Sequence, residues 1–563
     1  MRPVFVSPGT GQPTVGPYGG AAYFKTRVDQ LRSFAATYPA GPEPRGVVMI
    51  SSGDNFLAGP EFNASLALPV TERFYDAVAM QLIGFDAITP GNHDFDFGPE
   101  IFARFVNGFT DGTPFVSANL DFSLTPSVQP LVASGRVRRS VVLDVGGRQV
   151  GVVGATTTLL PFIASPVTVV VVPLLPVIQE EVDALTSQGV SIIVLSSHLQ
   201  NLSQEFQLVS QLRDVDAVIG GGGAELLANP GTPLVPGQTA NSTPLGGTGY
   251  PRIAVDSLGR SVPVVTTFGE YRYVGRLVLG FNAAGEVVAV DPISDVVRVS
   301  GRAGDPDAVV PDPAVQSQVV DPVSVSVAQL AANVLASSEV ALDGRRAIVR
   351  TRESNQGNLG ADSLLWQASL LAAGSGHPIP NVALQNGGGI RNNAIIPAGS
   401  FTELNTFEIN PFANFVVNVP SVSPEQFKLI LENAVSRVAQ EDGRFAQVAG
   451  FTMVWDASRQ PLTFAAGGTQ ISFPGERVRS VRTAAGSTAS SHQRTSTLAP
   501  ASAKQRRHSG TASSPPDFTR RMGWVTFSRS PCRCSRHWPG RSWRPTSDHP
   551  GPPAGRRWRA PSG

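Results

Sequence analysis

The stretch that decides the fold is Pro90-Gly91-Asn92-His93-Asp94-Phe95-Asp96-Phe97-Gly98, read together with Gly53-Asp54 upstream. An apolar run over residues 85–88 ends just before it, and an amide, an imidazole and a carboxylate follow in consecutive positions. Side chains that bind metals or transfer protons, placed directly after a predicted strand, indicate a functional site more than packing alone. The tripeptide Asn92-His93-Asp94 is weakly specific by itself, so the functional interpretation depends on which other residues of the chain lie near it.

Polar residues follow three predicted strands. Apolar runs over residues 47–50, 85–88 and 192–195 predict buried strands, and Asp54, Asn92 and His198 come just after them. Helical patterns alternate with these strands, over 21–38, 71–82, from 99 onward and over 177–188. Such alternation predicts a largely parallel sheet with covered faces. Ligands bind beyond the carboxyl ends of such strands, so we expect the three side chains at one edge of one sheet.

Each of these residues also has an ordinary structural explanation. His198 can be a buried or loop histidine, Asp54 a turn residue, and Asn92 the residue of a left-handed turn. Their convergence on one edge favours a site. Aspartate, asparagine and histidine together suit a borderline divalent ion such as Zn²⁺, Mn²⁺ or Fe²⁺, and Mg²⁺ stays open. His93, beside them, can protonate a leaving oxygen, and we expect Asp94 to hold its ring.

Length and composition exclude several classes of protein. A chain of 563 residues is too long for one core and predicts two or three domains. The net charge of +1 gives no indication of a nucleic-acid polymer as partner. No apolar run approaches the roughly 18–20 residues of a membrane span, and no signal-peptide pattern opens the chain. The two cysteines, Cys532 and Cys534, lie near the end, so we expect no disulfide in the folded part.

The second half of the chain predicts a linker, further helices and an unusual C-terminal segment. Residues 300–313, rich in Gly, Pro and Asp, predict a linker, and 322–336 predict an apolar helix. Another helix should begin at Ser423, with Gln426 completing a capping box. Beyond residue 483 Arg, Ser, Pro and Trp dominate and helical or strand periodicity ends. We favour a reading-frame error there over a basic disordered tail.

Several segments, in order, resemble the 5′-nucleotidase family over roughly residues 17–480. The resemblance to its metallophosphatase core and its nucleotide-binding domain rests on Gly53-Asp54, Gly91 to Gly98, Ser197-His198, Arg350 to Asn358, Asn386-Gly387-Gly388-Gly389-Ile390-Arg391 and Pro411-Phe412. The Asn-Gly-Gly-Gly-Ile-Arg string after an apolar strand is highly specific.

The resemblance implies an α/β protein: a four-layer α/β-sandwich metallophosphatase domain followed by a smaller α+β nucleotide-binding domain. We expect an irregular segment at 1–16, the metallophosphatase domain at 17–299, a linker at 300–318, the C-terminal domain at 319–482 and an aberrant tail at 483–563. The reaction would take place at the domain interface, on a nucleotide or small phosphate ester.

The resemblance also implies roles for individual residues. Asp54 would bridge two divalent ions, with Asn92 and His198 on the second ion, and His93 and Asp94 would act at the phosphate. Substrate binding would fall to Arg350 and Arg391 at phosphate or ribose, Asn386 hydrogen-bonded to the base, and Phe412 stacked on the base. Gly388 would also belong to the substrate-binding residues.

The sequence departs from the family pattern in three places. The family's opening strand with an Asp-x-His pair is missing from residues 1–16. The expected Gly-His-x-His is replaced by a glycine run in which Gly222 and Ala224 stand for the histidines, and Glu225 is the one substitute ligand. The family's second stacking Phe and its Gly-Gly-Asp loop are replaced by the sequence after residue 483.

These departures predict one firmly bound ion at most, out of one or two, and weak or absent hydrolysis of nucleotide esters (5′-nucleotidase or 2′,3′-cyclic phosphodiesterase type). The alternatives are a catalytically dead nucleotide-binding or scaffold protein, and a phosphodiesterase or sugar phosphatase of the same fold. By family analogy, we expect a periplasmic or extracellular location.

Overall fold

The computed structural model describes residues 4–5, 17–38, 44–223, 225–241, 249–412, 417–465 and 470–483. They form two compact units. The first holds the described residues up to Asn333 and those of Thr406–Ala413, and the second holds the remainder. The expectations for Ala224, for most of residues 1–16 and for the chain after 483 fall outside the described residues.

Two sheets form the centre of the first unit. The four-stranded sheet is parallel throughout, in the order β3 (Ile50–Ser51), β4 (Ala87–Ile88), β5 (Phe115–Val116), β7 (Val137–Arg138). The six-stranded sheet has a parallel centre and antiparallel edges, in the order β13 (Arg252–Val255), β14 (Ser261–Val265), β12 (Ala217–Gly221), β11 (Ile192–His198), β9 (Arg148–Thr156), β8 (Ser140–Val145).

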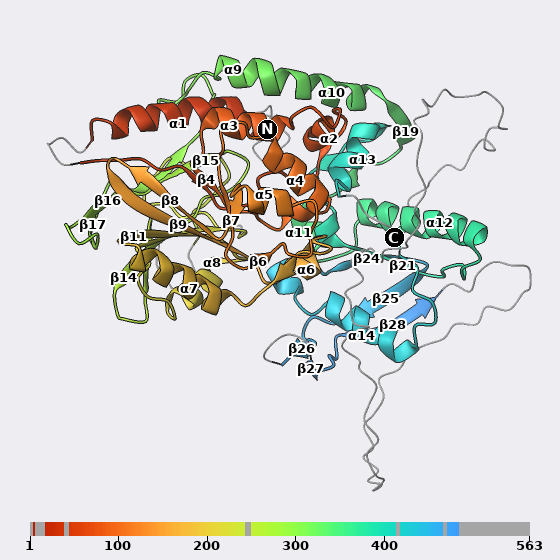
Figure 1. The fold of residues 1–563 in the computed structure, drawn as a ribbon. Helices are drawn as coiled ribbons and strands as arrows, with labels where there is room; N and C mark the ends of the chain where they lie inside the picture. Colours follow the sequence, from red (N-terminus) through yellow and green to blue (C-terminus); the bar gives the residue numbers. More distant parts are fainter. Residues whose placement is uncertain are drawn as a thin grey trace, which may run out of the picture. The chain divides into compact units, whose positions relative to one another are not determined.

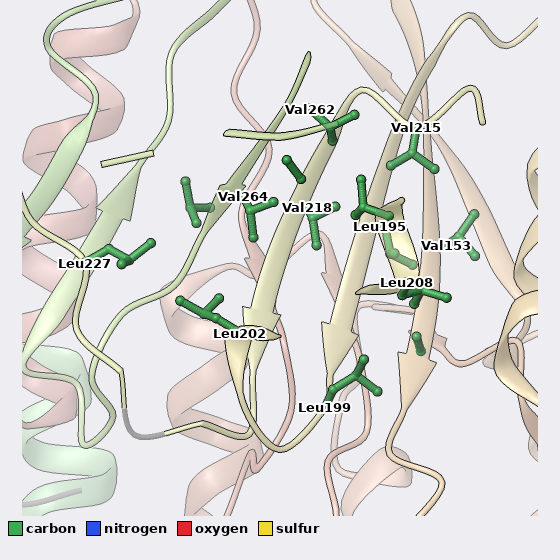
Figure 2. Close-up of a cluster of buried hydrophobic side chains, with 14 of the residues drawn as sticks. Val153, Leu195, Leu199, Leu202, Leu208, Val215, Val218, Leu227, Val262 and Val264 are labelled. Carbon is green, nitrogen blue, oxygen red and sulfur yellow. The ribbon is translucent and has the colours of Figure 1, made fainter. Parts of the chain in front are cut away.

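The buried clusters give four layers. Ala87 and Val116 of the first sheet pack against Val141 and Val152 of the second. The outer face of the first sheet is covered by α1 (Ala21–Ala35), α3 (Tyr75–Ile83) and α4 (Pro99–Asn107), and that of the second by α7 (Leu174–Ser187) and α8 (Leu202–Val209) (Figure 1). Figure 2 shows part of this second cover, where Leu202 lies near Val218 and Val264, and Leu208 lies near Leu195.

The four-layer α/β prediction is therefore confirmed, whereas the single sheet is wrong. Asp54 and Asn92 follow strands of the first sheet, and His198 ends a strand of the second. The alternation of helices and strands predicts which strands run parallel. It does not predict which strands belong to the same sheet.

Hydroxyl groups join the two sheets at their carboxyl ends. The Ser52 Oγ lies 3.0 Å from the Ser196 Oγ, and the Thr89 Oγ1 donates to the same atom at 2.7 Å. The Ser117 Oγ lies 2.9 Å from the Thr156 Oγ1. Because these contacts occur directly beneath the strand ends, they fix the position of one sheet's loops against the other's.

The residues after β18 (Asp295–Arg298) pack along the first unit, where the sequence predicted a linker. Gly301 donates its N–H to Pro17, Asp312 donates to Ala22, and Arg298 pairs with Asp305 at 3.0 Å. α10 (Asp321–Ala332) then ends early: the predicted helix over 322–336 is wrong in its last turn, because β19 (Val334–Ser338) begins there.

The other elements of the first unit are short: β1 (Val4–Phe5), β2 (Pro17–Tyr18), α2 (Pro60–Leu66), β6 (Leu120–Asp121), α5 (Gln129–Ala133), α6 (Leu160–Ile163), β10 (Val170–Val171), β15 (Tyr273–Arg276), β16 (Leu279–Phe281), β17 (Val287–Val290), α9 (Pro313–Val315) and a π-helix η2 (Gln316–Val320).

In the second unit α12 (Asn355–Ser375) packs against β21 (Ala383–Asn386) and β24 (Ala446–Ala449). α14 (Pro424–Ala434) begins with the predicted capping box of Ser423 and Gln426, which is confirmed. The remaining elements are β20 (Leu342–Asp343), α11 (Arg346–Val349), β22 (Ile395–Ile396), β23 (Gly399–Thr402), α13 (Glu403–Ile409), which crosses the unit boundary, β25 (Phe451–Trp455), β26 (Thr463–Phe464), β27 (Ile471–Phe473) and β28 (Val478–Thr483). Across the described ranges, no helix combines the length and apolarity that crossing a membrane requires.

Candidate active site

Three strand ends bring Asp54, Asn92 and His198 together. The Nε2 atom of His198 lies 3.1 Å from the Asp54 Oδ1 and 3.3 Å from the Asn92 Oδ1. His198 and Asn92 are buried, while the Asp54 side chain is 26% exposed. The predicted convergence of these residues is therefore present in the structure, with one wall contributed by each sheet.

Glycines make this close approach possible. A Cβ atom at Gly53 would lie 2.2 Å from the His198 Nδ1, and one at Gly91 would lie 2.3 Å from the Asp54 Oδ1. Asp54 itself has φ 52°, a left-handed conformation that is uncommon for residues other than glycine, whereas Asn92 is right-handed with φ −73°. Backbone strain of this kind persists where surrounding contacts enforce it and is common at functional sites.

His198 is oriented as metal-binding histidines usually are. Its Nδ1 lies 2.6 Å from the Ser52 carbonyl oxygen, which can only accept a hydrogen bond, so Nδ1 carries the proton and Nε2 faces Asp54 and Asn92. Burial disfavours the charged imidazole, but the Asp54 carboxylate outweighs it and raises the pKa of His198. Burial likewise opposes ionisation of Asp54, yet His198 and His93 lower its pKa below the ordinary value.

This donor set fits a divalent cation. A carboxylate oxygen, an amide oxygen and an imidazole nitrogen point to one place, and the second imidazole nitrogen is held by a carbonyl. The set is also small. Over the residues that the structure describes, no group of three or more His, Cys, Asp or Glu side chains gathers where it could hold a metal.

His93 has a different partner from the predicted one. Its Nδ1 lies 2.7 Å from the Asp96 Oδ2, in the 3₁₀ turn η1 (His93–Phe95). Asp94 is instead fully buried and accepts hydrogen bonds from the Gly91 N–H at 2.6 Å and the Asn55 Nδ2 at 3.1 Å. The expectation that Asp94 holds the His93 ring is therefore wrong. Burial, and then the nearby Asp54 charge, raise the pKa of Asp94 to about 7.

Phe412 lies in the first unit, against His93. The two rings are stacked, with centroids 5.7 Å apart and planes 11° from parallel. The four other predicted substrate-binding residues belong to the second unit.

In the second unit Arg350 is a buried guanidinium whose charge Asp442 and Glu441 balance only in part. Its Nη1 reaches the Glu441 carbonyl oxygen at 3.4 Å, and among the described residues its Nε has no hydrogen-bond partner. Burial, followed by repulsion from Arg346 and Arg391, lowers the pKa of Arg350 to about 10. Three cations held near one another in this way favour binding of an anion. Arg346 had not been predicted.

The glycine string forms a tight turn after β21. Gly388 donates its N–H to the Gly443 carbonyl at 2.8 Å, and a Cβ at Gly388 would lie 3.0 Å from the Gly443 Cα. The preceding Asn386 has an extended backbone, and the Arg391 Nη1 reaches the Gly388 carbonyl at 3.5 Å. The structure therefore brings Asn386, Gly388 and Arg391 together on one loop.

The glycine run at the end of β12 packs closely against the segment that follows His198. Gly222 is left-handed, with φ 79°, and a Cβ there would lie 1.9 Å from the Leu199 carbonyl oxygen. The Glu225 Oε1 accepts the Leu202 N–H at 3.1 Å. Its described contacts are thus made at the start of α8 rather than with Asp54, Asn92 or His198.

Sequence reasoning also missed Gln200, whose Nε2 lies 3.1 Å from the Asn92 Oδ1. No sequence signal marks it. Asp96, by contrast, could have been found, because residues i and i+3 of a 3₁₀ turn lie on the same side.

Known proteins resemble the chain over both units. A family model described as "5′-nucleotidase, C-terminal domain" matches residues 333–494. The 5′-nucleotidase of Mus musculus is 28% identical over 79% of this chain and 71% of its own. The trifunctional nucleotide phosphoesterase protein YfkN of Bacillus subtilis is 27% identical over 72% of this chain and 27% of its own. The crystal structure of the 5′-nucleotidase precursor of Thermus thermophilus superposes with a TM-score of 0.64, at 28% identity, over 86% of this chain and 83% of its own.

Proposed function

We propose that the chain is a member of the 5′-nucleotidase family and a metal-dependent hydrolase of nucleotide phosphate esters, either nucleoside 5′-monophosphates or 2′,3′-cyclic esters. The observation that carries the proposal is the meeting of Asp54, Asn92 and His198 at the ends of strands from two sheets, with His93 beside them.

A divalent ion held by Asp54, Asn92 and His198 would supply Lewis-acid chemistry at the phosphoryl group. The chain's own residues supply the proton transfer. With Nδ1 of His93 bound to Asp96, the ring is fixed, so Nε2 can donate to the leaving oxygen or to a phosphoryl oxygen. Asp54 accepts the His93 backbone N–H at 2.9 Å, which ties the proton donor to the metal ligands.

Substrate binding is assigned to the second unit and to Phe412. Arg350 and Arg391 would bind phosphate or ribose oxygens, and the turn at Asn386 and Gly388 would contact the base. Phe412 presents an aromatic face on which a base can stack.

The small ligand set supports a second part of the proposal: the chain holds one ion firmly at most, and its activity is low. Gly222 and Ala224, which stand where the family pattern has histidines, carry no metal-binding group for a second ion. The same observation favours the alternative, a nucleotide-binding protein without catalysis.

The test measures phosphate released from AMP and from 2′,3′-cyclic AMP by the full chain with added Mn²⁺. We expect slow, Mn²⁺-dependent release that Asp54→Ala abolishes. AMP binding by calorimetry without any turnover would instead favour the non-catalytic alternative. Two ions per chain retained after dialysis would contradict the single-ion proposal.

Export to the periplasm or outside the cell is part of the proposal. It is supported by the resemblance to the Thermus thermophilus protein, which is described as a precursor. Fractionation of cells that express the gene tests it, and retention in the cytoplasm would contradict it.

A further inference from the structure

We infer that Gln200 supplies a fourth ligand to the ion, in the place left by the histidines that the glycine run lacks. This inference rests on the proposed function, since it needs a cation at Asp54, Asn92 and His198.

The spacing of the donor atoms carries the inference. From Asp54 Oδ1 to His198 Nε2, on to Asn92 Oδ1 and then to Gln200 Nε2, successive distances are 3.1, 3.3 and 3.1 Å. Neighbouring ligands of an ion with bonds of about 2.0–2.1 Å lie about 2.9 Å apart at right angles and about 3.3 Å apart in a tetrahedron. The Gln200 amide therefore lies at ligand spacing from the Asn92 oxygen.

The backbone holds Gln200 at this point from both sides. Leu199 and Leu202 are each 3% exposed and lie in the core of the second sheet (Figure 2). The Gln200 N–H also donates to the Gln204 Oε1 at 3.0 Å. Gln200 is thus fixed within a segment whose neighbours cannot leave the core without losing apolar burial.

The glycine run and Gln200 are linked sterically. The Leu199 carbonyl oxygen fills the space that a side chain at Gly222 would need, at 1.9 Å from its Cβ position. Because residue 222 has no side chain, Leu199 and Gln200 can approach the site. Gln200 brings its side-chain amide with it.

The amide can present oxygen as well as nitrogen. As placed, the Gln200 N–H donates to the Asn92 Oδ1, the atom that a cation would take. A half-turn of the terminal amide exchanges its oxygen and nitrogen, which differ little in shape. Gln200 would then offer a neutral oxygen, which suits Mn²⁺, Mg²⁺ or Zn²⁺ and adds no charge beside Asp54.

The experiment titrates the full chain with Co²⁺ and with Mn²⁺, following the visible absorption of Co²⁺ and the Mn²⁺ dissociation constant by calorimetry. The variants are Gln200→Ala, Gln200→Glu and the matched control Gln207→Ala, an exposed glutamine on α8. Circular dichroism verifies that each variant is folded.

We expect Gln200→Ala to weaken Mn²⁺ binding about 10-fold and to change the Co²⁺ spectrum, with Gln207→Ala unchanged. Gln200→Glu should bind more tightly, because a carboxylate is a stronger ligand. Unchanged affinity in Gln200→Ala overturns the inference, as does weaker binding in Gln200→Glu, which would show that Gln200 only donates to Asn92.

The same titrations separate the inference from the proposed function. If the wild-type chain binds neither ion, both the inference and the metal dependence of the proposed function fail. If Asp54→Ala abolishes binding but Gln200→Ala does not alter it, only the inference fails.

Discussion

The Nδ1 atom of His93 lies 2.7 Å from Oδ2 of Asp96, across a single 3₁₀ turn, and both side chains are largely buried. Asp96 is the carboxylate that sets the orientation of this ring. Asp94 instead stabilises the loop, by accepting hydrogen bonds from the Gly91 N–H and the Asn55 side-chain amide.

Asp96→Asn should therefore lower kcat for AMP by about 100-fold, since the neutral amide provides no counter-charge for the imidazole when it acts as a general acid. Stability should change little, because the asparagine keeps the shape and can still accept from Nδ1. Steady-state phosphate release and the thermal midpoint together check this. An unchanged kcat would show that His93 does not transfer the proton.

Asp94→Ala should reduce stability instead. It leaves the Gly91 N–H and the Asn55 amide without their acceptor, and buried unsatisfied donors cost about 1–3 kcal/mol each. Urea denaturation measures the loss, which we place at about 2–4 kcal/mol. If Asp94→Ala is as stable as the wild type, the loop has another support.

Glu205→Gln should make the protein more stable at alkaline pH. Glu205 is 1% exposed, its Oε1 accepts the Ser197 hydroxyl, and burial raises its pKa to about 8. Below the unfolded pKa of about 4.5 the carboxyl is protonated in both states. As pH rises from there to about 8, the unfolded chain releases the proton first, so the wild type loses stability progressively, by an amount on the order of a few kcal/mol.

Thermal midpoints of wild type and Glu205→Gln across pH 5 to 9 check this sign. The variant's advantage should be small at pH 5 and largest above pH 8. A difference that is constant with pH would mean that Glu205 is already ionised in the folded protein.

Gly222→His, which restores one imidazole of the family pattern, should fail to improve metal binding and should destabilise the chain. The left-handed backbone alone costs about 1–2 kcal/mol for a residue with a Cβ, and the overlap with Leu199 adds to it. Gly231→His is the matched control, because Gly231 is equally left-handed, at φ 88°, but has open space around it. Mn²⁺ affinity above that of the wild type would contradict the expectation.

Arg350→Ala should weaken AMP binding about 10- to 100-fold, which corresponds to one lost charged hydrogen bond of about 1.5–3 kcal/mol. Arg345→Ala removes an exposed arginine already paired with Asp343 and should leave the affinity unchanged. Calorimetry with AMP measures both, whether or not the chain turns over. Equal affinities would show that the buried guanidinium is structural.

The sequence predicted the site well where chain direction alone decides it. Asp54, Asn92 and His198 follow apolar strands, and parallel strands necessarily end on one side. The partner of His93 was also within reach of the sequence, because Asp96 is three residues away and lies on the same side of a helical turn, whereas Asp94 is the next residue and does not.

The two-sheet division and the position of Gln200 were beyond sequence reasoning. Both depend on packing between segments far apart in the chain: Ala87 and Val116 against Val141 and Val152, and Leu199 against Gly222. Local pattern carries the period of a strand but not the identity of the strand that covers it.

The hydroxyl contacts of Ser52, Thr89 and Ser196 have a consequence for biosynthesis. Asp54 and Asn92 are complete as a pair once the first sheet's opening strands exist, but His198 arrives more than a hundred residues later, on the other sheet. A nascent chain that has made only the first sheet cannot capture an ion with all three side chains. Metal uptake by all three side chains would therefore follow the docking of the two sheets, and ion content would measure how completely the sheets have assembled.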